Sequence, residues 1–495
     1  MHASRIASYG VMGVIGWTAL AVALASAVPL GANRPVSWIG LSLATYALFA
    51  AALALDVHRP SSRAARLWPS ALLAALAIGW GFVQTSPMLS ALAQWFAARA
   101  AGTLGIVAPS LMHPVWSTVD APGAISADPI DGHHAVLRLT TYVALFWIAL
   151  QAGRDRGRAR AMLAAAAIGV SVLCAYGLLA AALGRNPLLG PDAKALSATF
   201  VNRNSFATYA AFGVIMNLAL TLAGFRHRAR RSRAMRDVAR AVVGRGWVHV
   251  VGFAVCAAAL LGSQSRGGAL AALVGSAAVV TLARRGGRGG GLRRPGVVLP
   301  ALVAAFVLCV GASGVLGRFL ADPSAENLRT PVYLATLDAI ADRPILGHGL
   351  GAYQDVFRAY VPMGAGAAEW DKAHNTYLEL AFELGVPAAC ALLLAIALLA
   401  ARVARGALAG GRNAAVMYAA AGCTLAAAVH SLVDFSLQIP AVAALFAVVL
   451  GLGTAAATAG TVPRRVRSWG AAGSQHHPLS AGVRYAGRRP PGWTG

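Results

Sequence analysis

His374 is the side chain of this sequence that is best placed to move a proton. It stands in a dense polar stretch with Glu369, Asp371, Lys372 and Asn375. An imidazole has an unperturbed pKa of about 6.5, which suits a general base near neutral pH. Glu379 and Glu383 follow on the next apolar run, and a carboxylate beside the ring would orient it. The alternative for a single histidine is a structural role.

A second group of candidates consists of arginines where polar segments meet apolar runs: Arg138, Arg203, Arg266 and Arg329. The guanidinium group is a planar fork of donors that matches phosphate oxygens, so several arginines together would bind a pyrophosphate. Arg266 is the most distinctive, because Gly267 and Gly268 follow it and allow close backbone approach. The alternative for each arginine is contact with lipid headgroups or with an acidic side chain.

The sequence contains neither a metal-binding motif nor a cofactor motif. HExxH and Asp-x-Asp are absent, and the adjacent His133 and His134 point apart. Residues 347–351 (GHGLG) resemble part of a dinucleotide fingerprint, but no βαβ pattern surrounds them. We expect them to form a tight turn between two helices. The sequence therefore predicts a metal-independent reaction without a cofactor.

The composition shows where these residues must be held. The chain has 495 residues, of which 58% are hydrophobic and 12% are charged, and its mean hydropathy is +0.63. A soluble domain of this size cannot hide so much apolar surface, so we predict an all-α polytopic membrane protein. About twelve runs have a suitable length for a spanning helix: 9–29, 37–56, 68–86, 136–153, 161–183, 205–224, 248–262, 267–283, 297–316, 377–400, 414–433 and 438–459.

The charge distribution predicts the orientation of these spans. The 42 Lys and Arg outnumber the 17 Asp and Glu and give a net charge of +25. With the N-terminus in the cytoplasm, alternation places 30 basic and 3 acidic residues inside, and 12 basic and 14 acidic residues outside. This is the positive-inside pattern, and it puts both termini in the cytoplasm. Nucleic-acid binding is disfavoured, because the arginine clusters are short loops without interleaved aromatic residues.

The spans divide the chain into four regions. Residues 1–316 would hold nine spans and a first long outer loop near 87–135, and we favour a retained first span over a cleaved signal peptide. Residues 317–376 would form a large, partly helical outer loop, in which 326–342 has helical apolar spacing suited to a membrane surface. Residues 377–459 would hold three more spans, and 460–495 a disordered basic cytoplasmic tail. Chemistry is therefore expected on the outer face.

Several motifs, taken together in their order along the chain, resemble the signature of the O-antigen ligase and polymerase superfamily over residues 120–455. The pair His374-Asn375 is followed by nine residues and then Gly385, although Ala388 stands where the ligase pattern has Gly or Thr. The other motifs are FVNRNSF at 200–206, SRGG at 265–268, GHGLGAY at 347–353, and Asp434-Phe435 with Gln438-Ile439-Pro440.

The resemblance implies a metal-independent, inverting glycosyltransferase of the GT-C type in the bacterial inner membrane. It would take a glycan from undecaprenyl pyrophosphate on the periplasmic face and transfer it to lipid A-core, a growing polysaccharide or a protein hydroxyl. His374 would be the general base, and Arg266 and Arg203 would hold the donor pyrophosphate together with Arg329 and Arg138. The supporting residues would be Asn375, Asn202, Glu379 and Asp434.

Two other functions are weighed against this one. A transporter of a small anion or glycan should have charged or broken helices near the bilayer midplane, whereas these runs are rich in Ala, Leu and Val and carry their polar groups at the outer ends. A membrane scaffold without activity would leave the FVNRN, SRGG and His-Asn motifs unexplained.

Overall fold

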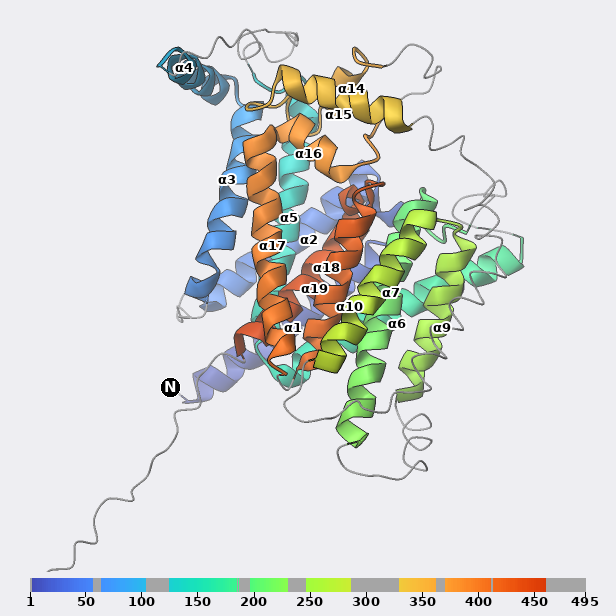
Figure 1. Cartoon of the computed structure of the whole chain (residues 1–495). Helices are drawn as coiled ribbons and strands as arrows, with labels where there is room; N and C mark the ends of the chain where they lie inside the picture. The colour runs from blue at the N-terminus through green and yellow to red at the C-terminus, as the bar shows by residue number, and fades with distance from the viewer. Residues whose placement is uncertain are drawn as a thin grey trace, which may run out of the picture. The chain divides into compact units, whose positions relative to one another are not determined.

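The computed structural model describes residues 2–56, 64–103, 124–184, 186, 196–229, 246–285, 329–361, 370–410 and 413–459. These residues contain helices and no strand. The chain divides into residues 1–461 and a second unit, residues 462–495; the predicted cytoplasmic tail lies outside the described residues. The helices of the first unit (Figure 1) are α1 (His2–Ala25), α2 (Pro35–Asp56), α3 (Trp68–Thr85), α4 (Pro87–Thr103), α5 (Pro129–Ala152), α6 (Arg156–Ala182), α7 (Arg203–Ala229), α9 (Trp247–Gly262), α10 (Arg266–Arg285), α14 (Arg329–Asp342), α15 (Tyr353–Phe357), α16 (Thr376–Leu384), α17 (Val386–Leu408), α18 (Ala414–His430) and α19 (Pro440–Ala459), with 3-10 turns η1 (Leu30–Ala32), η2 (Ala64–Leu67) and η5 (Ser436–Gln438).

The described helices confirm a polytopic all-α membrane protein. Seven are long and apolar enough to cross a membrane, or eight if the bent pair α3–α4 counts as one span. Shorter apolar helices lie at Gly10–Ala25, Trp247–Gly262 and Ala414–His430. Eleven of the twelve predicted runs overlap these helices, while the run 297–316 lies outside the described residues. The total of twelve therefore stays a prediction.

The tenth predicted span, 377–400, is wrong in its boundaries. Gly385 breaks the run into the short helix α16 and the spanning helix α17. Its φ of +76° is unfavourable for any residue with a side chain, and a Cβ there would lie 2.2 Å from the carbonyl oxygen of Ile345. The N–H of Val386 donates to the carbonyl oxygen of Pro344 at 2.8 Å. The long outer loop thus breaks the run, and the span begins at Val386.

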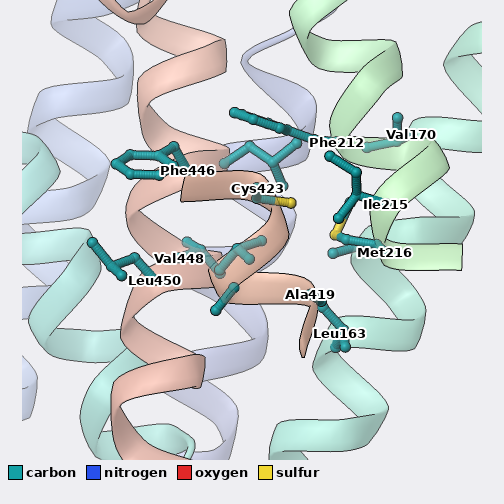
Figure 2. Close-up of a cluster of buried hydrophobic side chains, with 14 of the residues drawn as sticks. Leu163, Val170, Phe212, Ile215, Met216, Ala419, Cys423, Phe446, Val448 and Leu450 are labelled. Carbon is teal, nitrogen blue, oxygen red and sulfur yellow. The ribbon is translucent and has the colours of Figure 1, made fainter. Parts of the chain in front are cut away.

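The centre of the membrane part is formed by α19 and α7. The apolar stretch of α19 is fully buried inside the protein and that of α7 is 94% buried, whereas the values for α2, α5, α6, α10 and α17 lie between 22% and 44%. Figure 2 shows part of this core, where side chains of α6, α7, α18 and α19 meet: Leu163, Val170, Phe212, Ile215, Met216, Ala419, Cys423, Phe446, Val448 and Leu450. The peripheral helices therefore leave apolar faces for lipid, as a membrane bundle requires.

A second, smaller core lies in the predicted outer loop. Val332 and Ala339 of α14 are fully buried and pack with Tyr353, Phe357 and Phe382 of α15 and α16. One apolar face of the described part, 329–342, is covered by α15 and α16, while Leu334 and Leu337 stay exposed. The predicted contact of 326–342 with a membrane surface stays a prediction.

The start of α5 also differs from the prediction. The fourth span was expected from residue 136, but α5 begins at Pro129, seven residues earlier. Asp128 caps this end by accepting hydrogen bonds from the N–H groups of Ile130 and Asp131. Arg138 therefore lies inside the helix rather than at its mouth.

Candidate functional site

His374 lies just before α16 in an unusual backbone conformation. Its φ is +52°, in the left-handed region that costs a residue with a side chain about 1–2 kcal/mol. The imidazole lies edge-on to the rings of Trp370 and Phe435, with centroid distances of 6.1 and 5.1 Å. The Tyr333 hydroxyl donates to the His374 carbonyl oxygen at 3.0 Å. Aromatic side chains thus fix both the ring and the backbone of this residue.

The environment of His374 favours the neutral imidazole. Burial lowers its pKa below the usual 6.5, and the positive charge of Arg329 lowers it further, while Asp434, Asp371 and Glu379 act in the opposite direction. Its Nδ1 atom is buried and has no hydrogen-bond partner among the described residues. A neutral, desolvated imidazole with an unpaired ring nitrogen is suited to accept a proton from a bound hydroxyl group.

Asn375 acts as the N-cap of α16. Its side-chain oxygen accepts hydrogen bonds from the N–H groups of Tyr377 and Leu378 at 3.0 and 3.2 Å. The next residue, Thr376, donates from its N–H to the Ser431 carbonyl oxygen at 2.9 Å. Asn375 therefore supports the site by starting the helix that follows His374, a role that a capping residue performs with its side chain alone.

Glu379 does not orient the imidazole, contrary to the expectation for a nearby carboxylate. The side chain is 1% exposed. One oxygen accepts from Lys372 Nζ at 3.2 Å and the other accepts from the N–H of Ala373 at 3.0 Å. Because Lys372 and Ala373 directly precede His374, the carboxylate holds the backbone of the catalytic candidate instead of its ring.

Glu383 lies one helical turn further along α16 and is also buried. Burial and the negative charge of Glu379 raise its pKa to about 7, while Lys372 and the backbone N–H groups of Gly351 and Tyr353 lower it. The loop 347–353 thus wraps the end of α16 and places backbone donors around a carboxylate. This confirms the predicted tight turn between two helices, α14 and α15.

His348 in the same loop is a core residue. Its Nε2 lies 2.8 Å from the Ala339 carbonyl oxygen, and its ring packs on Phe382 with centroids 4.5 Å apart. Burial lowers its pKa to about 4, so the ring stays neutral at physiological pH. A Cβ at the following Gly349, whose φ is +112°, would lie 2.2 Å from Ser126 Oγ, and only glycine fits this approach.

Asp434 joins the start of α7 to the start of α16. It is fully buried, and its Oδ1 accepts from the Asn204 side-chain amide at 3.1 Å. The Ser436 hydroxyl donates to its other oxygen, and the Thr376 hydroxyl donates to its backbone carbonyl at 2.9 Å. Asn202 caps α7, since its side chain accepts from the N–H of Asn204 at 2.7 Å.

Arg266 is the first residue of α10, and Gly267 brings this helix end against α18. A Cβ on Gly267 would lie 2.8 Å from Cδ2 of the buried His430. The Nδ1 of His430 lies 2.6 Å from the Thr208 hydroxyl of α7. The close backbone approach expected at this glycine is therefore an approach between helices of the protein itself.

The four arginines do not share one environment. Arg203 is exposed at the first turn of α7, and Arg329, at the start of α14, acts electrostatically on His374 and His430 and forms no ion pair with a described residue. Arg138 lies with its guanidinium 5.6 Å from the ring centre of Trp38 and acts on Lys372. Arg203 and Arg266 thus precede Asn204 and Gly267, which contact the segment 430–434, and Arg329 acts on His430 in that segment. Arg138 acts instead on Lys372 of the Lys372–Glu379 pair.

The arrangement brings four helix N-termini to one place. The first turns of α7, α10 and α16 contact the segment 430–434 through Asn204, Gly267 and Thr376, and Arg329 at the start of α14 acts on His430. Each helix N-terminus carries about half a positive charge and therefore favours an anion, while the first N–H groups of α16 are already bound by Asn375 and Ser431. Three of the four begin with arginine.

The sequence missed several members of this site. Tyr333, Thr376 and Thr208 make their contacts only through the tertiary fold, and nothing in their own spacing marks them. Asn204 could have been found, because it stands in the same FVNRNSF motif as Asn202 and Arg203. Among the described residues no three His, Cys, Asp or Glu side chains gather in a metal-binding arrangement.

Comparison with known proteins finds a family match over part of the chain. The family model described as O-antigen ligase matches residues 251–393, a stretch that includes Arg266, Arg329, His374, Asn375 and Glu379. This confirms the resemblance to the O-antigen ligase and polymerase superfamily, and it supports glycan transfer of the ligase or polymerase kind. No curated protein matches the chain in a sequence search.

Proposed function

From the match of residues 251–393 to the O-antigen ligase family, we propose that this protein is an inverting, metal-independent glycosyltransferase of the GT-C type. It moves a glycan from undecaprenyl pyrophosphate to an acceptor hydroxyl at the periplasmic face of the bacterial inner membrane. The acceptor is lipid A-core, a growing polysaccharide or a protein. The observation that carries the proposal is the meeting of a neutral, unpaired histidine with four helix N-termini at the segment 430–434.

In this reaction His374 accepts the proton of the acceptor hydroxyl. The oxygen attacks the anomeric carbon of the glycan as the bond from that carbon to the pyrophosphate oxygen breaks, and the configuration inverts. Undecaprenyl pyrophosphate leaves with the bonding electron pair. A buried, neutral imidazole performs this step near pH 7, because its lowered pKa keeps it unprotonated.

The negative charge of the leaving group is stabilised by fixed positive groups. Arg266, Arg203 and Arg329 occupy the first turns of α10, α7 and α14, where helix dipoles add to their charge. Arginine forks bind phosphate oxygens in pairs. Such preorganised donors lower the cost of developing charge without reorganisation. Arg138 contributes a more distant positive charge beside Lys372.

The remaining residues hold the base in place. Glu379 fixes the backbone at Lys372 and Ala373, Asn375 starts α16, and Asp434 ties that start to α7. Asn202 caps α7 next to Arg203. These are positioning residues, since none contacts the reacting atoms directly.

Replacement of His374 by alanine tests the proposal. We expect loss of surface glycan assembly with unchanged protein amount and membrane insertion. His134→Ala is a matched control, because His134 is a partly exposed histidine on α5 whose contacts among the described residues are Asp131 and the ring of Trp38. An unchanged glycan profile in the His374 variant would refute the assignment of the base.

The glycan profile of a deletion strain separates the acceptors. Loss of capping on the lipopolysaccharide core indicates a ligase. Short chains with a single repeat still attached indicate a polymerase. Loss of glycosylated proteins indicates a protein acceptor. A profile identical to that of the parent strain contradicts glycan transfer altogether.

A further inference from the structure

The helix α4 stands apart from the bundle at a sharp angle. It follows α3 after one residue, Ser86, and the two helices are bent by 109°. The bent pair α3–α4 qualifies as a membrane span only as a unit, and we take α3, its longer and more apolar part, with Leu72, Leu76 and Phe82 exposed on its outside, as the part that crosses the membrane. A helix nearly perpendicular to a spanning helix runs close to the plane of the membrane. With 17 residues that include Gln94 and Arg99, α4 is too short and too polar to return through the bilayer.

One face of α4 is anchored to the protein. The Ser90 side chain is buried, and its hydroxyl donates to the carbonyl oxygen of Val83 at 2.8 Å. The Ser90 hydroxyl oxygen in turn accepts a hydrogen bond from the N–H of Ile125 at 3.0 Å. Gln84 follows Val83 and Ser126 follows Ile125 in the chain. The N–H of Ser126 donates a hydrogen bond to the carbonyl oxygen of Gln84 at 2.9 Å. The rotation of α4 about its axis is therefore fixed.

The opposite face of α4 carries an exposed apolar stripe. Its members are spaced i, i+4, i+7 and i+8 and therefore share one side of the helix. Their exposed fractions are large: Met88 78%, Leu92 53%, Trp95 54% and Phe96 59%. A patch of this kind on a surface that faced only water would be unfavourable. Among the described residues only α3 packs extensively on α4.

The chemistry of the stripe matches a lipid surface. Trp95 and Phe96 meet edge to face with centroids 4.8 Å apart, and the Arg99 guanidinium lies 5.4 Å from the ring centre of Trp95. Tryptophan is enriched at the level of the headgroups, and arginine extends its charge toward their phosphates. No acidic residue occurs in α4. A protein partner would not explain why the stripe follows directly on a membrane-spanning helix.

We propose that α4 is an interfacial helix, whose stripe of Met88, Leu92, Trp95 and Phe96 inserts into the lipid surface of the outer leaflet. Its anchored face connects to the outer layer through Gln84, whose side-chain amide donates to the carbonyl oxygens of Leu346 and Glu383 at 2.7 and 2.9 Å. The lipid contact thus sets the height of the layer that carries α16 above the bilayer. This role is independent of the reaction that the protein catalyses.

Spin labels on the full-length protein in lipid nanodiscs test the proposal. Single cysteines are introduced at Leu92 and Phe96 after Cys309 and Cys390 are exchanged for alanine, and a nitroxide is attached. Collisions with oxygen and with a water-soluble nickel chelate are then measured in a phosphatidylethanolamine and phosphatidylglycerol bilayer. The controls are labels at Leu76, on the exposed face of α3, and at Asp355, which is 46% exposed on α15.

We expect labels at Leu92 and Phe96 to collide with oxygen and to lose collisions with the nickel chelate relative to the label at Asp355. They should lie shallower than the label at Leu76. Trp95→Glu should restore nickel collisions at Leu92 while the protein elutes normally from a gel-filtration column. Collisions like those at Asp355 would overturn the proposal, and so would protection from both reagents, because that result means that protein covers the stripe.

Discussion

The ion pair between Lys372 and Glu379 gives a quantitative prediction about the position of His374. Two unit charges 3.2 Å apart attract by about 5 kcal/mol at an effective dielectric constant of 20, before the cost of desolvation is subtracted. After that cost, charge-assisted hydrogen bonds contribute about 2 kcal/mol. Glu379→Gln removes the charge but keeps an acceptor for the N–H of Ala373. If the pair holds His374 in its left-handed conformation, this variant should lower kcat about thirtyfold, since 1.4 kcal/mol is tenfold.

The assay is transfer of a lipid-linked glycan by purified protein, with kcat and KM measured separately for Glu379→Gln, Lys372→Met and the double variant. We expect KM for the donor to change little, because the proposal assigns donor binding to the arginines and to neither of these residues. The loss in the double variant should be close to that of a single variant, since both break the same contact. Asp355→Asn, an exposed carboxylate on α15 of the same outer layer, is the control and should have no effect. Additive losses, or a change confined to KM, would refute the reasoning.

Three further predictions concern the same layer. The value of kcat/KM should rise with pH and level off below pH 6.5, because burial and Arg329 lower the pKa of His374 and only the neutral ring accepts a proton. Arg329→Gln should move this rise toward pH 6.5. A rise at unchanged pH would show that the charge of Arg329 does not act on His374. Glu383 has a pKa of about 7 in the folded protein and 4.5 as a free side chain, so its ionisation destabilises the fold as the pH rises from 4.5 to 7. Glu383→Gln should therefore raise the melting temperature at pH 8 relative to the parent and change it little at pH 4. Equal shifts of the melting temperature at both pH values would contradict this pH dependence. Gly347→Ala should destabilise the protein by about 2 kcal/mol or more, because φ is +71° and a Cβ would lie 2.3 Å from the Glu383 carbonyl oxygen. The loss is measured as a fall in melting temperature. An unchanged melting temperature would show that the turn is not held against α16.

The sequence predicted the membrane helices well and their breaks poorly. Hydropathy finds a span because an apolar run is a local property, and α2, α3, α10 and α19 lie close to their predicted boundaries. The break at Gly385 is not local. Residues 376–384 are good helix formers, and the chain turns there because Pro344 and Ile345, forty residues earlier, occupy the path of the backbone.

The candidate site was predicted in its residue types more than in its contacts. Asn375 could have been assigned as a helix cap, since Asn before a helical pattern favours that role, and His374 stood out by its polar surroundings. The role of Glu379 could not be derived, since its acceptor atoms reach back to Lys372 and Ala373 only once the loop takes the left-handed turn at His374. Likewise, Gly267 indicated close approach, but only the fold shows that His430 is the group that approaches.

The measurement that tests the central claim most directly is a single-turnover reaction with a defined undecaprenyl-pyrophosphate-linked glycan and a mixture of candidate acceptors. The parent protein should release undecaprenyl pyrophosphate and form a glycoside of inverted configuration without added metal. His374→Ala should bind the donor as the parent does and release nothing above background. Normal release by the His374 variant, or a product of retained configuration, would contradict the account.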